Sequence, residues 1–200
     1  MILSAGRVAE ELLKAGEANC EDPLIIVPLP NVRELRDSGA ASIDLRLGSW
    51  FVTLRNARMS HLEVDDQEPQ MQLTKTHYVP FGHKYFLHPQ GFVLGVTLEW
   101  VCLPKNLAAY VIGRSSWGRR GLVIATATGV HPGFRGCLTL EMRNLGEIPI
   151  SIKPGMTICQ LFFHQVQSTA GEGDRSMFLG RRRPTLGRVR CDQMAERLAR

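Results

Sequence analysis

The sequence predicts a mainly β protein, folded as a distorted antiparallel barrel of jelly-roll type with a short N-terminal helix and a C-terminal arm. Short apolar segments recur between residues 42 and 167, and Gly, Pro and Asn residues separate them. Several segments alternate apolar and polar residues, as strands with one buried face do. The 200 residues can form one domain with a proper core, and a hydrophobic content of 44% is ordinary for a globular protein.

The first expected element is a short helix over Ala5–Ala15. Val8 and Leu12 recur at helical spacing, which gives the helix one apolar face. Ser4 can cap the first turn with its hydroxyl group, and Gly16 is a residue type that often ends a helix.

After this helix the chain is expected to run mostly as strands. Three prolines around an apolar centre predict an extended segment over 21–31, and residues 33–37 can form one helical turn. Residues 42–55 alternate as a half-buried strand does, and the polar residues 56–75 predict a surface loop. The further expected strands are KYFLH, GFVLGVTLEWVCL, AAYVIG, LTLEMRNL and ISIKPGMTICQLFFHQV.

Composition places a single domain at residues 1–167 and a flexible, arginine-rich arm at 168–200. The arm begins with a small and polar stretch that is typical of linkers, and it contains the triplet Arg181–Arg183. A basic arm of this kind can be merely solvated, can bind a polyphosphate, or can attract nucleic acid nonspecifically. Because aromatic residues do not interleave with the arginines, the pattern argues against a single-stranded nucleic acid as the partner.

The sequence also predicts a cytoplasmic protein with reduced thiols. Its five cysteines are scattered along the chain, and none forms a C-x-x-C pair or a cluster with zinc-ligand spacing. No apolar run reaches the roughly 20 residues of a membrane span. Charged residues interrupt the N-terminal apolar stretch, which is unlike a signal peptide.

The turn RSSWGRRG, Arg114–Gly121, has the composition of an anion-binding site. Guanidinium groups and serine hydroxyls donate hydrogen bonds, and glycines let the backbone approach a phosphate closely. The alternative is an ordinary basic surface turn, although such a turn needs fewer residues of these types.

Glu141 stands alone in the apolar strand TLEM and is the candidate acid–base residue. A carboxylate there is held by partners, solvated in a cleft, or directed to solvent beside Thr139 and Arg143. The zinc-binding signatures H-x-E and P-C-x-x-C are absent from this sequence. Acid–base chemistry by this chain would therefore depend on a side chain such as Glu141.

Several segments together resemble a known family. ASIDLRLG, RSSWGRRG, TATGVHPGFRG, LTLEMRNLGEIPISIKPGMTICQLFF and GRRRPTLGR occur in this order along the chain. They resemble motifs of the dCTP deaminase branch of the trimeric dUTPase-like superfamily, among them R-S-S-x-x-R-x-G, T-A-x-x-[IV]-D-P-G-[FW]-x-G and G-Q-x-G-P-T-x-S-R. The resemblance implies a dUTPase-like fold, a homotrimer with active sites between subunits, and hydrolytic deamination of dCTP to dUTP and ammonia.

The resemblance also implies roles for individual residues. Glu141 would be the general base and acid, supported by Ser115 and Arg119. Ala127 would line the pocket for the pyrimidine, and His131 would face the sugar. The triphosphate would carry Mg²⁺, with no metal ligands from the chain. The triphosphate would be bound by Arg114, Ser116 and Gln160. A closing lid would contribute Phe178 and Arg181 to the nucleotide site.

The sequence departs from the family pattern in several places. His131 stands where the family has an Asp, Met177–Phe178 replace a Lys-Tyr pair, and Arg181 replaces a Gln. Since the Asp also positions the attacking water in triphosphatases, His131 argues more against pyrophosphate release than against deamination. Two alternatives stay open: a dUTPase or bifunctional enzyme that releases pyrophosphate, and a catalytically silent regulatory protein that binds nucleotides. Inhibition by dTTP also stays open.

Overall fold

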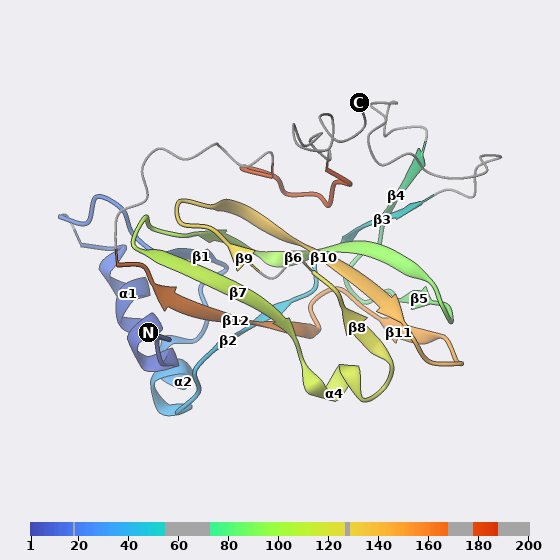
Figure 1. The fold of residues 1–200 in the computed structure, drawn as a ribbon, viewed down its shortest axis with the longest axis horizontal. Helices are drawn as coiled ribbons and strands as arrows, with labels where there is room; N and C mark the ends of the chain where they lie inside the picture. The colour runs from blue at the N-terminus through green and yellow to red at the C-terminus, as the bar shows by residue number, and fades with distance from the viewer. Residues whose placement is uncertain (18, 55–72, 127–128, 168–177, 188–200) are drawn as a thin grey trace, which may run out of the picture.

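The structure of the chain, a computed structural model, is organised around antiparallel sheets (Figure 1). Ala127, most of the expected loop after residue 55, and both ends of the expected arm lie outside the part that it describes. The described residues are 1–17, 19–54, 73–126, 129–167 and 178–187.

The largest sheet has six strands in the order β4-β3-β6-β10-β8, and β1 pairs with β6 beside this path. All of its pairs are antiparallel, as short connections between successive strands favour. Its strands are β1 (Ile25–Val27), β3 (Trp50–Leu54), β4 (Thr74–Tyr78), β6 (Phe92–Cys102), β8 (Leu122–Ile124) and β10 (Arg135–Asn144).

A four-stranded sheet in the order β2-β12-β7-β9 and a two-stranded sheet of β5 and β11 complete the fold. Their strands are β2 (Ile43–Arg46), β5 (Tyr85–Leu87), β7 (Leu107–Gly113), β9 (Gly129–Val130), β11 (Ile150–Ile152) and β12 (Thr157–Gln165). The prediction of a mainly β, antiparallel protein is therefore confirmed. The described strands form separate sheets around a core rather than one closed barrel.

The core lies between the sheets because each long strand alternates buried and outward residues. In β10 the buried positions include Leu140 and Met142, while Glu141 between them faces outward. In β12 Leu161 and Phe163 point into the same core. The alternation that predicts strands in the sequence is thus the alternation that builds this interior.

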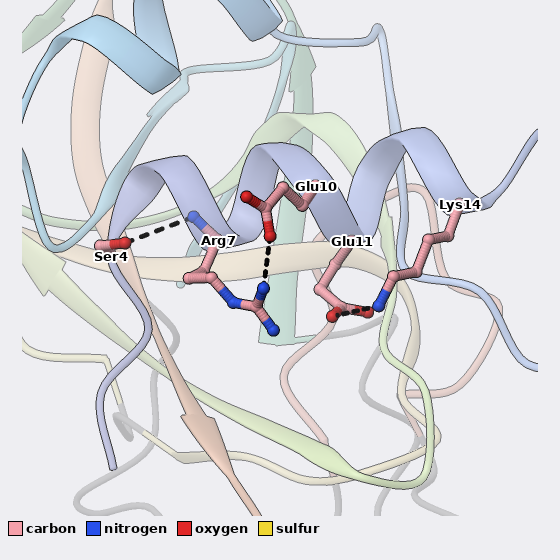
Figure 2. A network of polar contacts seen from close by, with 5 residues as sticks. All are labelled: Ser4, Arg7, Glu10, Glu11 and Lys14. Carbon is pink, nitrogen blue, oxygen red and sulfur yellow. Dashed lines mark hydrogen bonds and ion pairs between the residues drawn. The ribbon is translucent and has the colours of Figure 1, made fainter.

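The N-terminal helix α1 (Ala5–Lys14) is confirmed, and it starts as its sequence predicts. The backbone amide of Arg7 donates a hydrogen bond of 3.3 Å to the Ser4 hydroxyl, which caps the helix, as Figure 2 shows. Lys14 and Glu11 form an ion pair of 2.8 Å on the outer side of the same helix (Figure 2). Helix α2 (Val32–Asp37) lies beside α1 (Figure 1), with Asn31 as its N-cap.

One boundary of the sequence prediction is wrong. Thr74 and Lys75 belong to β4, which pairs with β3 along its whole length, and not to a surface loop. The sequence misses this strand because TKTHY is polar and only one edge of β4 is paired, so no apolar alternation marks it. Within the described residues, no helix is long and apolar enough to cross a membrane.

Candidate active site

The predicted anion turn forms the short helix α4 (Ser115–Gly118) between β7 of one sheet and β8 of the other (Figure 1). Trp117 anchors it, because its indole Nε1 donates a hydrogen bond of 2.8 Å to the Thr157 carbonyl in β12. The Trp117 ring also packs against the core. The turn is therefore fixed to the four-stranded sheet by its middle residue.

The glycine that ends the turn is required by its backbone geometry. Gly121 has a φ of +88°, and a Cβ atom at this position would stand 2.8 Å from the Gly146 nitrogen. The Gly121 carbonyl accepts a hydrogen bond of 2.8 Å from the Leu145 amide. The last glycine of RSSWGRRG thus lets α4 lie directly against the turn that follows β10.

Arg114 is held beside a carboxylate that the sequence does not single out. Its guanidinium forms an ion pair with the carboxylate of Asp44 in β2. Asp44 is paired in register with Gln160 of β12, and directly paired residues share one face of a sheet. The structure therefore brings the predicted phosphate ligands Arg114 and Gln160 together around Asp44.

The other polar residues of the turn differ in what they contact. Ser115, Ser116 and Arg119 are exposed, and the Arg119 guanidinium has no hydrogen-bond partner among the described residues. Arg120 is tied back, because its Nη1 donates a hydrogen bond of 2.7 Å to the Ser116 carbonyl. Two hydroxyls and one guanidinium are consequently available to a ligand at the start and end of α4.

Glu141 lies at the middle of β10, next to the segment that runs towards Ala127. The Glu141 carbonyl accepts a hydrogen bond of 2.8 Å from the Ala125 amide, and the Glu141 amide donates one of 3.1 Å to the Thr126 hydroxyl. Its side chain is half-buried on the outer face of the sheet. In the described part of the chain its carboxylate has no hydrogen-bond or ion-pair partner, and the side chain is not enclosed in the core.

The segment after β8 carries the residues expected to receive the base and sugar. It leaves the six-stranded sheet at Ile124 and joins the four-stranded sheet at β9, so it bridges the two sheets. Ala127 lies outside the described residues. His131 is exposed in the turn after β9. Phe134 is partly buried and packs against the core.

The described part of the expected arm, residues 178–187, lies next to the start of β10. The Gly180 amide donates a hydrogen bond of 2.6 Å to the Arg135 carbonyl, and the Cys137 amide donates one of 2.9 Å to the Arg181 carbonyl. The side chains of Phe178 and Arg181 are exposed. Since Cys137 precedes Glu141 by four positions, Arg181 lies about 13 Å along the strand from Glu141.

The candidate residues thus fall into three groups within one chain. Arg114, Gln160 and the α4 turn form the first group, which is hereafter called the cradle. The second is Glu141 with the Ala125–Thr126 backbone, and the third is the arm. In the part of the chain that the structure describes, no hydrogen bond or ion pair joins the Glu141 carboxylate to the cradle or to His131.

One partly buried ion pair of structural importance, Glu99 with Arg46, was not predicted from the sequence. The Glu99 side chain is buried, at 2% exposure, and it accepts hydrogen bonds from the Arg46 amide at 2.8 Å and the Arg46 Nε at 2.7 Å. This pair connects β2 to β6, and so the cradle's sheet to the sheet of Glu141. A lone Glu in the apolar run GFVLGVTLEWVCL is the signal that could have identified it.

The likeness of this chain to a known family extends well beyond a few isolated motifs. The model of the family described as "dCTP deaminase-like" matches residues 11–166. The chain belongs to the dCTP deaminase-like family. The match covers both the cradle and the Glu141 strand, so the motifs lie in the family's domain and not in an unrelated sheet protein.

Curated relatives within this family carry two different names. A protein of Methanobrevibacter smithii named "dCTP deaminase, dUMP-forming" is 32% identical over 198 residues, which covers 96% of this chain and 97% of the relative. A protein of Natronomonas pharaonis named "dCTP deaminase" is 39% identical over 158 residues, which covers 76% of this chain and 81% of the relative. Membership of the dCTP deaminase-like family is therefore supported across almost the full chain.

A solved structure supports the fold. The 2′-deoxycytidine 5′-triphosphate deaminase of Agrobacterium tumefaciens matches with a TM-score of 0.59 at 22% identity. The match covers 82% of this dCTP deaminase-like chain and 48% of the Agrobacterium chain. The chain spans about half of that longer protein, so the likeness concerns the fold of the shared part.

Proposed function

We propose that this chain catalyses the hydrolytic deamination of dCTP to dUTP and ammonia. The observation that carries the proposal is the place of Glu141, beside the backbone of Ala125–Thr126 and without a partner for its carboxylate among the described residues. Backbone groups of such a segment can read the edge of a pyrimidine, while a carboxylate beside them can move protons at its C4 atom. Membership of the dCTP deaminase-like family supports this assignment.

The reaction needs one group that first accepts and then returns a proton. Glu141 takes a proton from the water that forms the new bond from oxygen to C4. It returns a proton to the amino nitrogen, the bond from C4 to nitrogen breaks, and ammonia leaves. Ser115 and Arg119 orient the water and stabilise the charge that develops on the ring.

The cradle is proposed to hold the triphosphate. Arg114, Ser116 and Gln160 supply a guanidinium, a hydroxyl and an amide from one region, and Arg181 adds a second guanidinium from the arm. Within the described residues, no group of three or more His, Cys, Asp or Glu side chains is arranged to hold a metal. Mg²⁺ is proposed to accompany the triphosphate and to neutralise the charge of its oxygens.

A homotrimer with shared sites is proposed as the active assembly. Among the described residues no hydrogen bond or ion pair joins the Glu141 carboxylate to the cradle, so a site that needs both can be completed by a neighbouring copy. Mixing inactive Glu141→Gln and Arg119→Ala chains tests this, after the subunits have been allowed to exchange. If sites are shared, about a quarter of wild-type activity returns. Two inactive variants that stay inactive in a mixture would contradict shared sites.

The central test is the variant Glu141→Gln, assayed with dCTP by chromatography of the products and by ammonia release. We expect loss of activity by a factor of about 100 or more, because the amide cannot carry the proton, while nucleotide binding stays intact. The control is Glu147→Gln, which changes an exposed carboxylate in the turn after β10. Retained ammonia release in Glu141→Gln would remove Glu141 from its role. Tight binding by the wild-type chain without any turnover would instead support the regulatory alternative.

A second candidate function is formation of dUMP with release of pyrophosphate. The name "dCTP deaminase, dUMP-forming" of the Methanobrevibacter smithii relative favours it. His131 counts against it, because a neutral imidazole does not supply the negative charge of the carboxylate that this position carries in the family motif. The same chromatographic assay distinguishes the two, since dUTP accumulates in the first case and dUMP in the second. The cytoplasmic location stays a prediction, and inhibition by dTTP stays open.

A further inference from the structure

The C-terminal arm carries two cation–π contacts that neither the family motif nor the proposed chemistry requires. The guanidinium carbon of Arg183 lies 3.9 Å from the ring centre of Trp50, and that of Arg182 lies 4.8 Å from the ring centre of Trp100. Both distances are within the range of about 6 Å in which a cation is attracted to an aromatic face. In the motif G-Q-x-G-P-T, these two arginines stand at an unspecified residue and at a glycine.

The two tryptophans lie on the same face of the six-stranded sheet as Glu141. Glu141 is paired with Leu94, and Leu94 with Val52, so these three side chains point to one side. Trp50 precedes Val52 by two positions, which keeps it on that side. Trp100 is paired with Cys137, which precedes Glu141 by four positions in β10 and so lies on the same side. The rings are therefore fixed points on the surface that carries the proposed catalytic carboxylate.

The backbone of the arm adds a second set of contacts at the same place. Gly180 and Arg181 exchange hydrogen bonds with Arg135 and Cys137, at the end of β10 that β8 does not reach. Pro184, which follows the arginine triplet, is buried. Burial also raises the pKa of the Cys137 thiol, and the charge of Arg182 opposes this increase, which places the Arg182 side chain near Cys137. The arm is consequently seated on the sheet through both its backbone and its side chains.

The sheet face that carries the two tryptophans also carries apolar side chains that are shielded from water. Val52, Leu94 and Val96 share the outer face, do not belong to the core between the sheets, and are nevertheless buried. A bare outer face of an antiparallel sheet would leave such side chains in solvent. This face therefore acts as a second, smaller apolar layer in the folded chain.

We propose that Trp50 and Trp100 are positioning residues that seat the C-terminal arm through Arg183 and Arg182. The three arginines of the triplet then have two different roles. Arg182 and Arg183 hold the arm to β6 and β3, while Arg181, whose side chain is exposed, is left to face the triphosphate. The seating stands independently of the reaction, whereas the phosphate role of Arg181 rests on the proposed function.

Amide hydrogen exchange on the full-length protein, resolved to single residues, tests the seat. The Gly180 and Cys137 amides report on docking because each donates a hydrogen bond that joins the arm to β10. The Ala125 amide is bonded to the Glu141 carbonyl and reports on a part of β10 away from the arm. We expect Arg182→Gln and Arg183→Gln each to increase exchange at Gly180 and Cys137 about two- to five-fold, since each removes one exposed cation–π contact. Exchange at Ala125 stays unchanged.

Matched variants separate seating from simple loss of charge. Arg181→Gln removes the same charge but keeps the backbone carbonyl that Cys137 uses, so the exchange rates stay at wild-type values while the KM for dCTP rises. Trp100→Phe keeps an aromatic face and retains part of the protection that Trp100→Leu loses. The double variant Arg182→Gln/Trp100→Leu exchanges no faster than the faster of the two single variants, because both remove the same contact.

The proposal is overturned if Arg182→Gln and Arg183→Gln both leave exchange at Gly180 and Cys137 unchanged, or if Arg181→Gln increases it equally. An unchanged KM in Arg181→Gln would count against the proposed phosphate role alone and would leave the seat intact. Since the arginine variants alter exposed side chains, they test the contact even if a tryptophan variant fails to fold.

Discussion

The cradle and the Glu141 strand are built in opposite ways, although the proposed reaction needs both. The cradle is fixed by an indole hydrogen bond, by the Arg114–Asp44 ion pair and by a glycine with positive φ. The Glu141 backbone is equally well fixed, but its carboxylate has no partner among the described residues. The fold thus prepares the donors in advance and leaves the proton carrier unengaged, which is what a preorganised site requires.

The largest expected effect concerns the fixed side of this comparison, at Gly121. In Gly121→Ala the positive φ and the contact with the Gly146 nitrogen should lower the free energy of unfolding by about 2 to 4 kcal/mol. Urea unfolding followed by fluorescence measures this. Gly118→Ala is the matched control, because a Cβ there meets nothing within 4 Å and replaces a glycine in α4. Equal stability of the two variants would show that the turn is looser than described.

The connection between the two sheets gives the next largest effect. Glu99→Gln removes the charge that Arg46 contacts through its Nε and its amide, so we expect a loss of about 1.5 to 3 kcal/mol in the free energy of unfolding. The measurement is again urea unfolding, with Glu147→Gln as the exposed control. A loss below 0.5 kcal/mol, as expected of surface pairs, would mean that the sheets need no such link.

Asp44→Asn affects ligand binding more than stability. The Arg114–Asp44 pair is partly exposed, so its loss costs at most about 1 kcal/mol of folding free energy. We nevertheless expect the KM for dCTP to rise about three- to ten-fold, because Arg114 is no longer held in one position. Steady-state kinetics and a melting curve on the same sample separate the two effects. An unchanged KM would show that the ion pair does not organise the cradle.

The smallest effect appears at alkaline pH in the strand that supports α4. Burial raises the pKa of the Cys159 thiol from 9.0 to about 12. In the unfolded chain the thiol ionises above pH 9 and in the folded chain it stays protonated. Stability is therefore complete below pH 9 and falls as the pH rises towards 12, by up to about 1 kcal/mol near pH 9.5. Unfolding of wild type and Cys159→Ala between pH 7 and 10 checks this, and a parallel decline in both would contradict it.

Much of the fold could be predicted because its signals are local. The cap of α1 depends on Ser4 and Arg7, and the long strands follow from alternation within single segments. Polar β4 shows the limit, because its place is decided by the neighbouring β3 and not by its own residues. Closure of the barrel, likewise, depends on how strand edges meet in three dimensions.

The candidate site was less predictable because its supports come from distant residues. Arg114 was predicted from its turn, but its partner Asp44 lies 70 positions earlier. The indole of Trp117 donates its hydrogen bond to a carbonyl 40 positions later in the chain. The cation–π contacts of the arm join residues that no motif links. Composition can thus indicate a chemical role, while the groups that orient each side chain depend on the fold.

The environment of the buried Asn144 side chain affects its spontaneous deamidation during storage. Its Nδ2 donates hydrogen bonds to the carbonyls of Leu87 and Ile148, and its Oδ1 accepts one from the Gly146 amide. Spontaneous deamidation starts when the next backbone nitrogen attacks the side-chain amide, and here the Leu145 amide is engaged with the Gly121 carbonyl. The folded chain therefore protects this asparagine during long storage. Conversion to aspartate after unfolding would place a carboxylate against two carbonyl oxygens and hinder refolding of this corner.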